Sequence, residues 1–133
     1  MAENIPYPVG LKVDDNGTFW VGAAEQGATG DPNALDEVYS KRILSFSPGE
    51  TLREIVSFAE GSSITFFDVD ISGTLYLPIN RSLYKCVPKG TLTEIAVGFS
   101  DLRGAAVASD GRVYLTDYET GALYRLTPLP SAN

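Results

Sequence analysis

The sequence contains no histidine, and this absence excludes several kinds of active site. None of the 133 residues is a histidine, and Cys86 is the single cysteine. Ser-His-Asp and Cys-His nucleophiles, the common zinc sites that contain histidine, and thiolate clusters all need residues that this chain lacks. Cys86 cannot form an internal disulfide, and its segment "LYKCVP" resembles apolar segments elsewhere in the chain. We therefore expect Cys86 to be a core thiol.

Long apolar runs and positive charges are also scarce. The chain has no run of about 18 apolar residues, and its start, "MAENIPYP", lacks the charged beginning and apolar core of a signal peptide. Ten basic residues against 17 acidic ones give a formal net charge of −7. Nucleic acids and anionic membranes are bound through basic patches. We therefore expect a cytoplasmic protein of one domain, residues 1–133, that binds neither nucleic acid nor membranes.

A threefold repeat runs along the chain. The turn glycines Gly17, Gly73 and Gly111 align the segments "DDNGTFWVG", "DISGTLYLP" and "ASDGRVYLT". In each unit, a β-type run precedes the turn, a run with an aromatic residue follows it, and a third run ends in proline. A fourth run follows in the first two units. The expected strands are 9–13, 19–21, 43–48 and 52–56, then 65–69, 75–77, 83–88 and 92–97, then 103–107, 113–115 and 123–128.

The composition of these runs predicts an all-β fold. Val, Ile, Thr and aromatic residues alternate within the runs, and Gly, Asn, Asp and Pro occupy the joints, as in short antiparallel strands. We expect the Asn-Gly and Asp-Gly joints to form two-residue hairpin turns. Four short strands in about 40 residues are typical of one blade of a β-propeller. A β-sandwich or meander built from a duplicated hairpin is the alternative.

One segment carries a family resemblance. The stretch "VASDGRVYLTDYETGALYRLTP" resembles blades of NHL-repeat, strictosidine-synthase-like and gluconolactonase-like (SGL) propellers. The resemblance implies three four-stranded blades at about 8–56, 62–97 and 102–128, with an insertion at about 23–39. Such blades occur in lyases, in lactonases and in interaction modules, so the fold alone does not indicate the function.

Three blades do not close a ring, because propellers usually contain about four to eight. The third unit lacks a fourth run, whereas "ENIP" near the N-terminus has the pattern of the fourth runs "REIV" and "TEIA". We therefore expect residues 1–7 to close the third blade of a second copy. The resulting homodimer would have six blades. The alternative is that the chain is a fragment of a longer propeller.

Candidate binding residues follow from the alignment. In propellers, the starts of the inner strands line the mouth of the channel, and the loops between second and third strands surround it. The aligned mouth positions are Val9, Thr65 and Arg103, and the loop candidates are Glu25, Asn80, Arg81, Asp117, Tyr118 and Glu119. Arg103 would suit an anionic or carbonyl-bearing ligand, or would instead pair with Asp101 or a loop carboxylate. We expect a module that binds a small molecule or peptide.

The resemblance also implies an enzymatic alternative. In gluconolactonase-like propellers, a carboxylate at the end of the second strand works with a divalent metal, and Asp117 in "VYLTDYETG" matches it. This implies a lactonase-like hydrolase that uses Ca or Mn, with Glu25 of the acidic insertion as a further candidate ligand. The matching positions in the other blades are Ala23 and Ile79, and an aspartate here also caps turns in non-catalytic blades. A virginiamycin-B-lyase-like activity is not expected, because that chemistry resembles one with a histidine base.

The aromatic residue of each second strand predicts how the blades pack. Trp20, Tyr76 and Tyr114 occupy one equivalent place in the repeat. We expect their rings to lie in the interfaces between sheets, with their polar tips directed to a rim.

Overall fold

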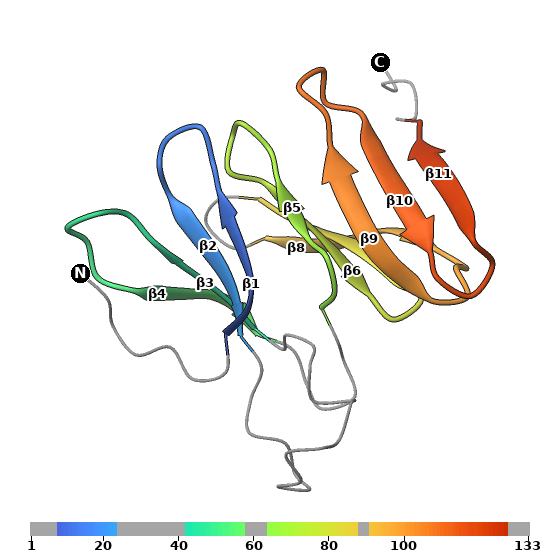
Figure 1. The fold of residues 1–133 in the computed structure, drawn as a ribbon, viewed down its shortest axis with the longest axis horizontal. Helices are drawn as coiled ribbons and strands as arrows, with labels where there is room; N and C mark the ends of the chain where they lie inside the picture. Colours follow the sequence, from blue (N-terminus) through green and yellow to red (C-terminus); the bar gives the residue numbers. More distant parts are fainter. Residues whose placement is uncertain (1–7, 24–41, 58–63, 88–90, 128–133) are drawn as a thin grey trace, which may run out of the picture.

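A computed structural model describes residues 8–23, 42–57, 64–87 and 91–127 of the chain. Within these ranges all regular secondary structure is β, and none of it is a helix that could cross a membrane. The strands form three antiparallel sheets that follow one another in chain order (Figure 1). The closing strand expected at 1–7, the insertion beyond Ala23 and Glu25 lie outside the described residues.

Each sheet corresponds to one unit of the repeat. The first sheet has the order β1 (Pro8–Val13), β2 (Phe19–Ala23), β3 (Arg42–Phe46) and β4 (Arg53–Ser57). The second has the order β5 (Asp68–Val69), β6 (Leu75–Ile79), β7 (Ser82–Cys86) and β8 (Leu92–Val97). The third contains β9 (Leu102–Val107), β10 (Val113–Asp117) and β11 (Ala122–Leu126), with β10 in the middle. The described part of the third sheet therefore has three strands.

The hairpin turns differ from the expected two-residue type. Gly17, Gly73 and Gly111 have the positive φ angles that favour glycine, 80°, 86° and 88°. However, the N–H of Gly17 donates to the carbonyl of Asp14, three residues earlier, at 3.0 Å. The N–H groups of Gly73 and Gly111 likewise donate to the carbonyls of Asp70 and Ala108, so the expectation of two-residue turns at these glycines is wrong. At Gly17, the carboxylate of Asp14 stabilises the longer loop. It accepts the backbone N–H groups of Asn16 and Thr18, each at 2.9 Å.

Two apolar clusters lie at the two junctions between neighbouring sheets. The first junction, between the first and second sheets, contains Trp20, Ile43, Ile64, Phe67, Leu75, Leu77, Ile79 and Cys86. The second junction, between the second and third sheets, contains Tyr76, Leu83, Leu102, Val113 and Leu115. Cys86 is 1% exposed, which confirms a core thiol. The interface positions expected for Trp20 and Tyr76 are also confirmed.

The second and third sheets are also joined through their backbones. The N–H of Phe66 donates to the carbonyl of Arg103 at 2.8 Å, and the N–H of Ala105 donates to the carbonyl of Phe66 at 2.9 Å. These bonds form a parallel bridge between Phe66 and Gly104. The strand expected at 65–69 is therefore reduced to β5 and the isolated bridge of Phe66, because Phe66 bonds to the third sheet.

Candidate functional site

The binding candidates of the second and third sheets meet at one end of the second junction. The N–H of Leu102, at the start of β9, donates to the carbonyl of Asn80 at 2.8 Å. The N–H of Tyr118 donates to the carbonyl of Asp101, also at 2.8 Å. The start of β9 is thus bonded to the loops that follow β6 and β10. We call this group of residues the crown: Thr65, Asn80, Arg81, Asp101, Arg103, Tyr118 and Glu119.

Arg103 lies between a carboxylate and an aromatic ring of the crown. Its Nε donates to Oδ2 of Asp101 at 3.0 Å, and its terminal nitrogen lies 2.9 Å from the same oxygen. The guanidinium carbon lies 4.0 Å from the centroid of the Tyr118 ring, within the range of a cation–π contact. The pairing of Arg103 with Asp101, offered as the alternative to ligand binding, is therefore present. The Arg103 side chain is 31% exposed and Tyr118 is 70% exposed, so the stacked pair still borders solvent.

The loop between β6 and β7 is attached to the segment that leads into β9. Asn80 has a φ of 56°, a left-handed conformation that asparagine tolerates better than most residues. Nε of Arg81 donates to the carbonyl of Phe99 at 3.0 Å, and the N–H of Phe99 donates to the carbonyl of Arg81 at 3.3 Å. The Arg81 side chain is therefore used in part to hold the two sheets together.

Thr65 lies between the second and third sheets. Its N–H donates to the carbonyl of Pro78 at 3.2 Å, and its hydroxyl lies 3.5 Å from the carbonyls of Pro78 and Leu102. Val9, aligned with Thr65 in the sequence, lies on β1 of the first sheet. The structure thus brings Thr65 and Arg103 to the second junction and places Val9 in another sheet.

Asp117 is a buried cap beneath the crown. It is 2% exposed, and its two carboxylate oxygens accept four backbone N–H groups. The donors are Ser100 at 2.8 Å, Glu119 at 3.1 Å, Asp101 at 3.2 Å and Thr120 at 3.3 Å. Burial raises the pKa of Asp117, but the hydrogen bonds from the four amides outweigh it and hold the pKa below its usual range. The carboxylate is therefore ionised at neutral pH and ties the loop after β10 to the start of β9.

This arrangement does not fit Asp117 as a metal ligand. Both of its oxygens already accept N–H donors, and Asp117 is 2% exposed, so a cation could reach the carboxylate only if the surrounding loops moved apart. Within the described ranges, no three His, Cys, Asp or Glu side chains are grouped so that they could hold a metal. Glu25, the other candidate ligand, lies outside those ranges. The lactonase-like alternative therefore stays a prediction.

Sequence reasoning missed two residues that lie at the second junction. Asp68 accepts the N–H of Val107 through Oδ2 at 2.9 Å, so its side chain bonds the inner strand of the second sheet to the third. Phe66 is 72% exposed beside β9. A signal for Phe66 was available, because neighbouring residues in a strand face opposite sides and Phe67 takes the core side. No signal in the sequence indicates the long-range bond of Asp68.

Comparisons with known proteins support a propeller-like fold. No family model and no curated protein matches the chain. Among solved structures, it is similar to virginiamycin B lyase from Staphylococcus aureus, with a TM-score of 0.61 and 18% identity over 92% of this chain and 42% of that one. A streptogramin B lyase structure gives a TM-score of 0.55 and 16% identity over 96% of this chain and 57% of that one.

A third similar structure contains a ligand. It is a catalytically inactive histidine-to-alanine variant of the S. aureus virginiamycin B lyase with quinupristin. Its TM-score is 0.53, with 14% identity over 93% of this chain and 57% of that one. The chain therefore spans about half the length of these structures. At such identities the similarity shows the fold alone: antiparallel sheets arranged as in a β-propeller.

Proposed function

We propose that this chain is a propeller module that binds a small molecule or a peptide at the crown. The observation that supports the proposal is the guanidinium of Arg103, held over the Tyr118 ring at 4.0 Å and anchored by Asp101. The backbone bonds of β9 and the cap of Asp117 fix this pair in place before a ligand arrives. Such preorganisation lowers the cost of binding.

The chemistry of the crown favours a flat ligand with a carboxylate or carbonyl group. Guanidinium groups bind carboxylate oxygens through charge-assisted hydrogen bonds. The Tyr118 ring is 70% exposed and offers an apolar surface beside that charge. An aromatic carboxylate, or the end of a peptide with an aromatic side chain, would use both features at once.

Binding is a better proposal than lyase chemistry. One of the similar lyase structures is an inactive variant in which a histidine is replaced by alanine. This chain contains no histidine in any of its 133 residues. Its own residues therefore offer no imidazole for an equivalent step, whereas the crown offers recognition groups.

The proposed module is completed by a second copy of the chain. We propose a six-bladed homodimer in which residues 1–7 add the fourth strand to the third sheet of the partner. The support is that the described residues form three sheets, fewer than the four to eight blades of known rings. The finer assignment to the NHL-repeat or SGL type stays a prediction.

Titration with benzoate, followed by NMR of the backbone amides, tests the binding proposal. We expect benzoate to shift the amides of the crown residues, and benzylamine, a ring of similar size with the opposite charge, to leave them in place. The variant Arg103→Gln should bind benzoate about tenfold more weakly, because it loses a charge-assisted interaction.

The control is Arg112→Gln, which removes the same charge from another turn. Arg112 pairs with Asp110 at 3.5 Å, and both side chains are more than half exposed. Its benzoate affinity should match that of the unaltered chain. Crown amides that do not respond to benzoate, or equal affinities of the two variants, would contradict an Arg103-centred site.

A further inference from the structure

One face of the third sheet does not face the second sheet. Within this sheet, Tyr114 pairs with Ala106 and Arg125, and Thr116 pairs with Leu123. Because side chains alternate along a strand, these residues share a face opposite to that of Val113 and Leu115, which pack at the second junction. We call it the outer face of the third sheet: Ala106, Tyr114, Thr116, Leu123 and Arg125.

Leu123 is exposed at a position that is buried in the other two sheets. Leu123, Leu83 and Ile43 all lie on third strands, each opposite the residue two places after the shared aromatic. Ile43 and Leu83 are both 0% exposed, whereas Leu123 is 71% exposed. In the first two sheets this position is covered by the next sheet in the chain. The equivalent position of the third sheet lacks such a cover within the described residues.

The sheet that covers this position always presents the same kind of surface. Ile43 packs in a cluster with Leu75 and Leu77, and Leu83 packs in a cluster with Val113 and Leu115. These covering residues are the first and third residues of a second strand. The equivalent residues of β2 in the first sheet are Phe19 and Val21, which lie on the side of their strand opposite to Trp20.

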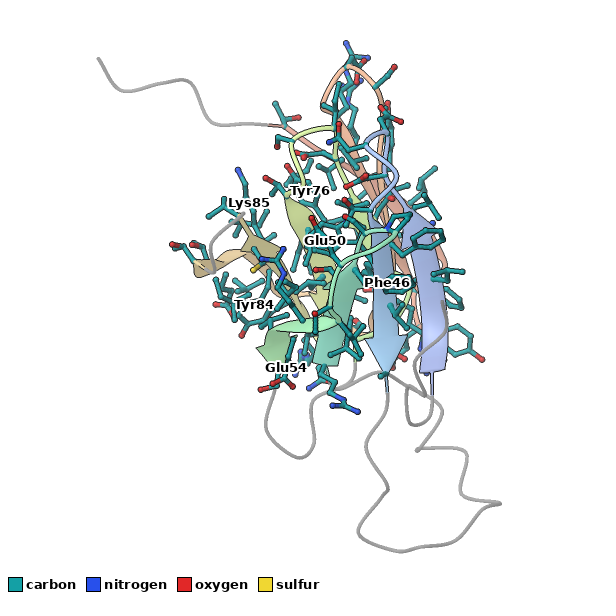
Figure 2. The ribbon with its side chains drawn as sticks, turned by 90° about the vertical axis from the view of Figure 1, so that its left-hand side faces the viewer. Phe46, Glu50, Glu54, Tyr76, Tyr84 and Lys85 are labelled. Carbon is teal, nitrogen blue, oxygen red and sulfur yellow. The ribbon has the colours of Figure 1, made fainter. Side chains whose placement is uncertain are left out.

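The first sheet therefore has an outer face of the matching type. Cross-strand pairs place its members on one side: Leu11 with Val21, Val13 with Phe19, Val21 with Leu44, Phe19 with Phe46, and Leu44 with Glu54. Leu11 is 61% exposed and Val13 is 54% exposed, whereas Val21 and Leu44, in the middle of this face, are 5% and 4% exposed within one chain. The rings of Phe19 and Phe46 stack with their centroids 4.9 Å apart. Figure 2, which turns the first sheet toward the viewer, shows Phe46 and Glu54 on this sheet.

We infer that the outer face of the third sheet docks on the outer face of the first sheet of a second copy. This inference rests on the proposed six-bladed assembly and identifies the surfaces that close it. Leu123 and Tyr114 would occupy the place that Ile43 and Trp20 occupy at the first junction. The charges also match, because Arg125 lies on one face and Glu54 on the other, and both are exposed.

The symmetry of the contact follows from the two different faces. Each copy offers one third-sheet face and one first-sheet face, so a two-fold pair makes the same contact twice. Such a head-to-tail contact closes into a ring when the rotation fits, as it would with two arcs of three blades. A pairing of two like faces would instead bury the same residues on both copies.

Measurement of the mass in solution by light scattering, with the full chain, tests the docking. We expect about 28 kDa for the unaltered chain, twice its 14.3 kDa. Leu123→Glu should raise the dimer dissociation constant at least about tenfold and release the monomer, because it buries a charge in an apolar contact. Leu123 is already 71% exposed within one chain, so the fold of the monomer should persist, as circular dichroism would show.

The matched control is Ile71→Glu. Ile71 is 72% exposed in the turn between β5 and β6, away from both outer faces, and its variant should remain a dimer. A second variant, Leu11→Glu, alters the outer face of the first sheet, which is the other partner of the proposed contact. It should also release the monomer. A mixture of Leu123→Glu and Leu11→Glu should form a heterodimer, because one of its two contacts joins unaltered faces.

The outcomes separate the docking from the assembly on which it rests. A monomeric unaltered chain overturns both. A dimer that persists in Leu123→Glu overturns the docking and leaves the exchange of residues 1–7 as the basis of assembly. A mixture that stays monomeric, although both variants are folded, overturns the head-to-tail arrangement.

Discussion

Within the described residues, the two junctions of the molecule are built by different interactions. The first junction is a larger apolar cluster around Trp20 and Ile43. The second has a smaller apolar cluster, together with hydrogen bonds from one sheet to the next through the backbone of Phe66 and the carboxylate of Asp68. Apolar burial supplies stability without direction, whereas hydrogen bonds fix positions.

This difference accounts for where the candidate site lies. The crown is at the second junction, where directional bonds hold β9 against the second sheet. Arg103 therefore has a defined place relative to Tyr118 and Asn80. A site that must hold a ligand in one orientation needs such support from rigid elements. The variants below separate the contribution of packing from that of directional bonding.

Removal of the Trp20 side chain should have the largest effect. Trp20 is 9% exposed in the first cluster, and its indole N–H donates to Asp14 at 3.0 Å. Trp20→Ala should reduce the free energy of unfolding by about 3–5 kcal/mol, measured by urea denaturation. Trp20→Phe keeps most of the ring and should cost less.

Tyr114 provides the comparison at the equivalent position. It lies on the outer face of the third sheet and is only partly buried, so Tyr114→Ala should cost less than Trp20→Ala under conditions where the chain is monomeric. A loss below about 1 kcal/mol for Trp20→Ala would mean that the first junction does not depend on packing of this ring.

Neutralisation of Asp117 should have an intermediate effect that depends on pH. The folded chain lowers the pKa of Asp117, so its ionised form stabilises the fold above the pKa that this group has in the unfolded chain. That contribution is lost as the pH falls through the folded pKa. Asp117→Asn should therefore lower the Tm by several degrees at neutral pH and by much less in acid.

Asp110→Asn is the matched control for this variant. Asp110 is exposed in the turn before β10 and accepts one backbone N–H, from Arg112 at 3.0 Å. Its replacement should change the Tm little at any pH. Equal effects of Asp117→Asn and Asp110→Asn at neutral pH would show that the four bonds of Asp117 add no stability.

Metal addition should have the smallest effect. Because both oxygens of Asp117 accept backbone N–H groups, we expect calcium or manganese to leave the Tm of the chain unchanged. Thermal melting with and without each ion checks this. A rise of several degrees that disappears in Asp117→Ala would instead support the lactonase-like alternative.

Much of the fold could be predicted from the sequence because the repeat is local. The three turn glycines and the alternating runs predict strands whose pairing partners are next to them in the chain. β8, observed at Leu92–Val97, has the limits that the sequence predicts. The turns were predicted less well, since the role of the Asp14 carboxylate depends on the conformation of the loop.

The site could be predicted only in part. Alignment to a repeat indicates which end of a sheet a residue occupies, and Arg103, Asn80 and Tyr118 lie together at one end of the second junction. It does not indicate bonds between sheets, such as that of Asp68 with Val107, 39 residues apart. Alignment also could not decide whether Asp117 caps a turn or binds a metal, because this depends on where four backbone amides point.

The strand order has a consequence for synthesis of the chain. In every sheet, hydrogen-bonded neighbours are strands that follow one another in the sequence. Each sheet can therefore form as soon as its own residues have left the ribosome, and local pairing of this kind favours rapid folding. Closure of the proposed ring is the one step that must wait for a second chain, so its rate should depend on protein concentration.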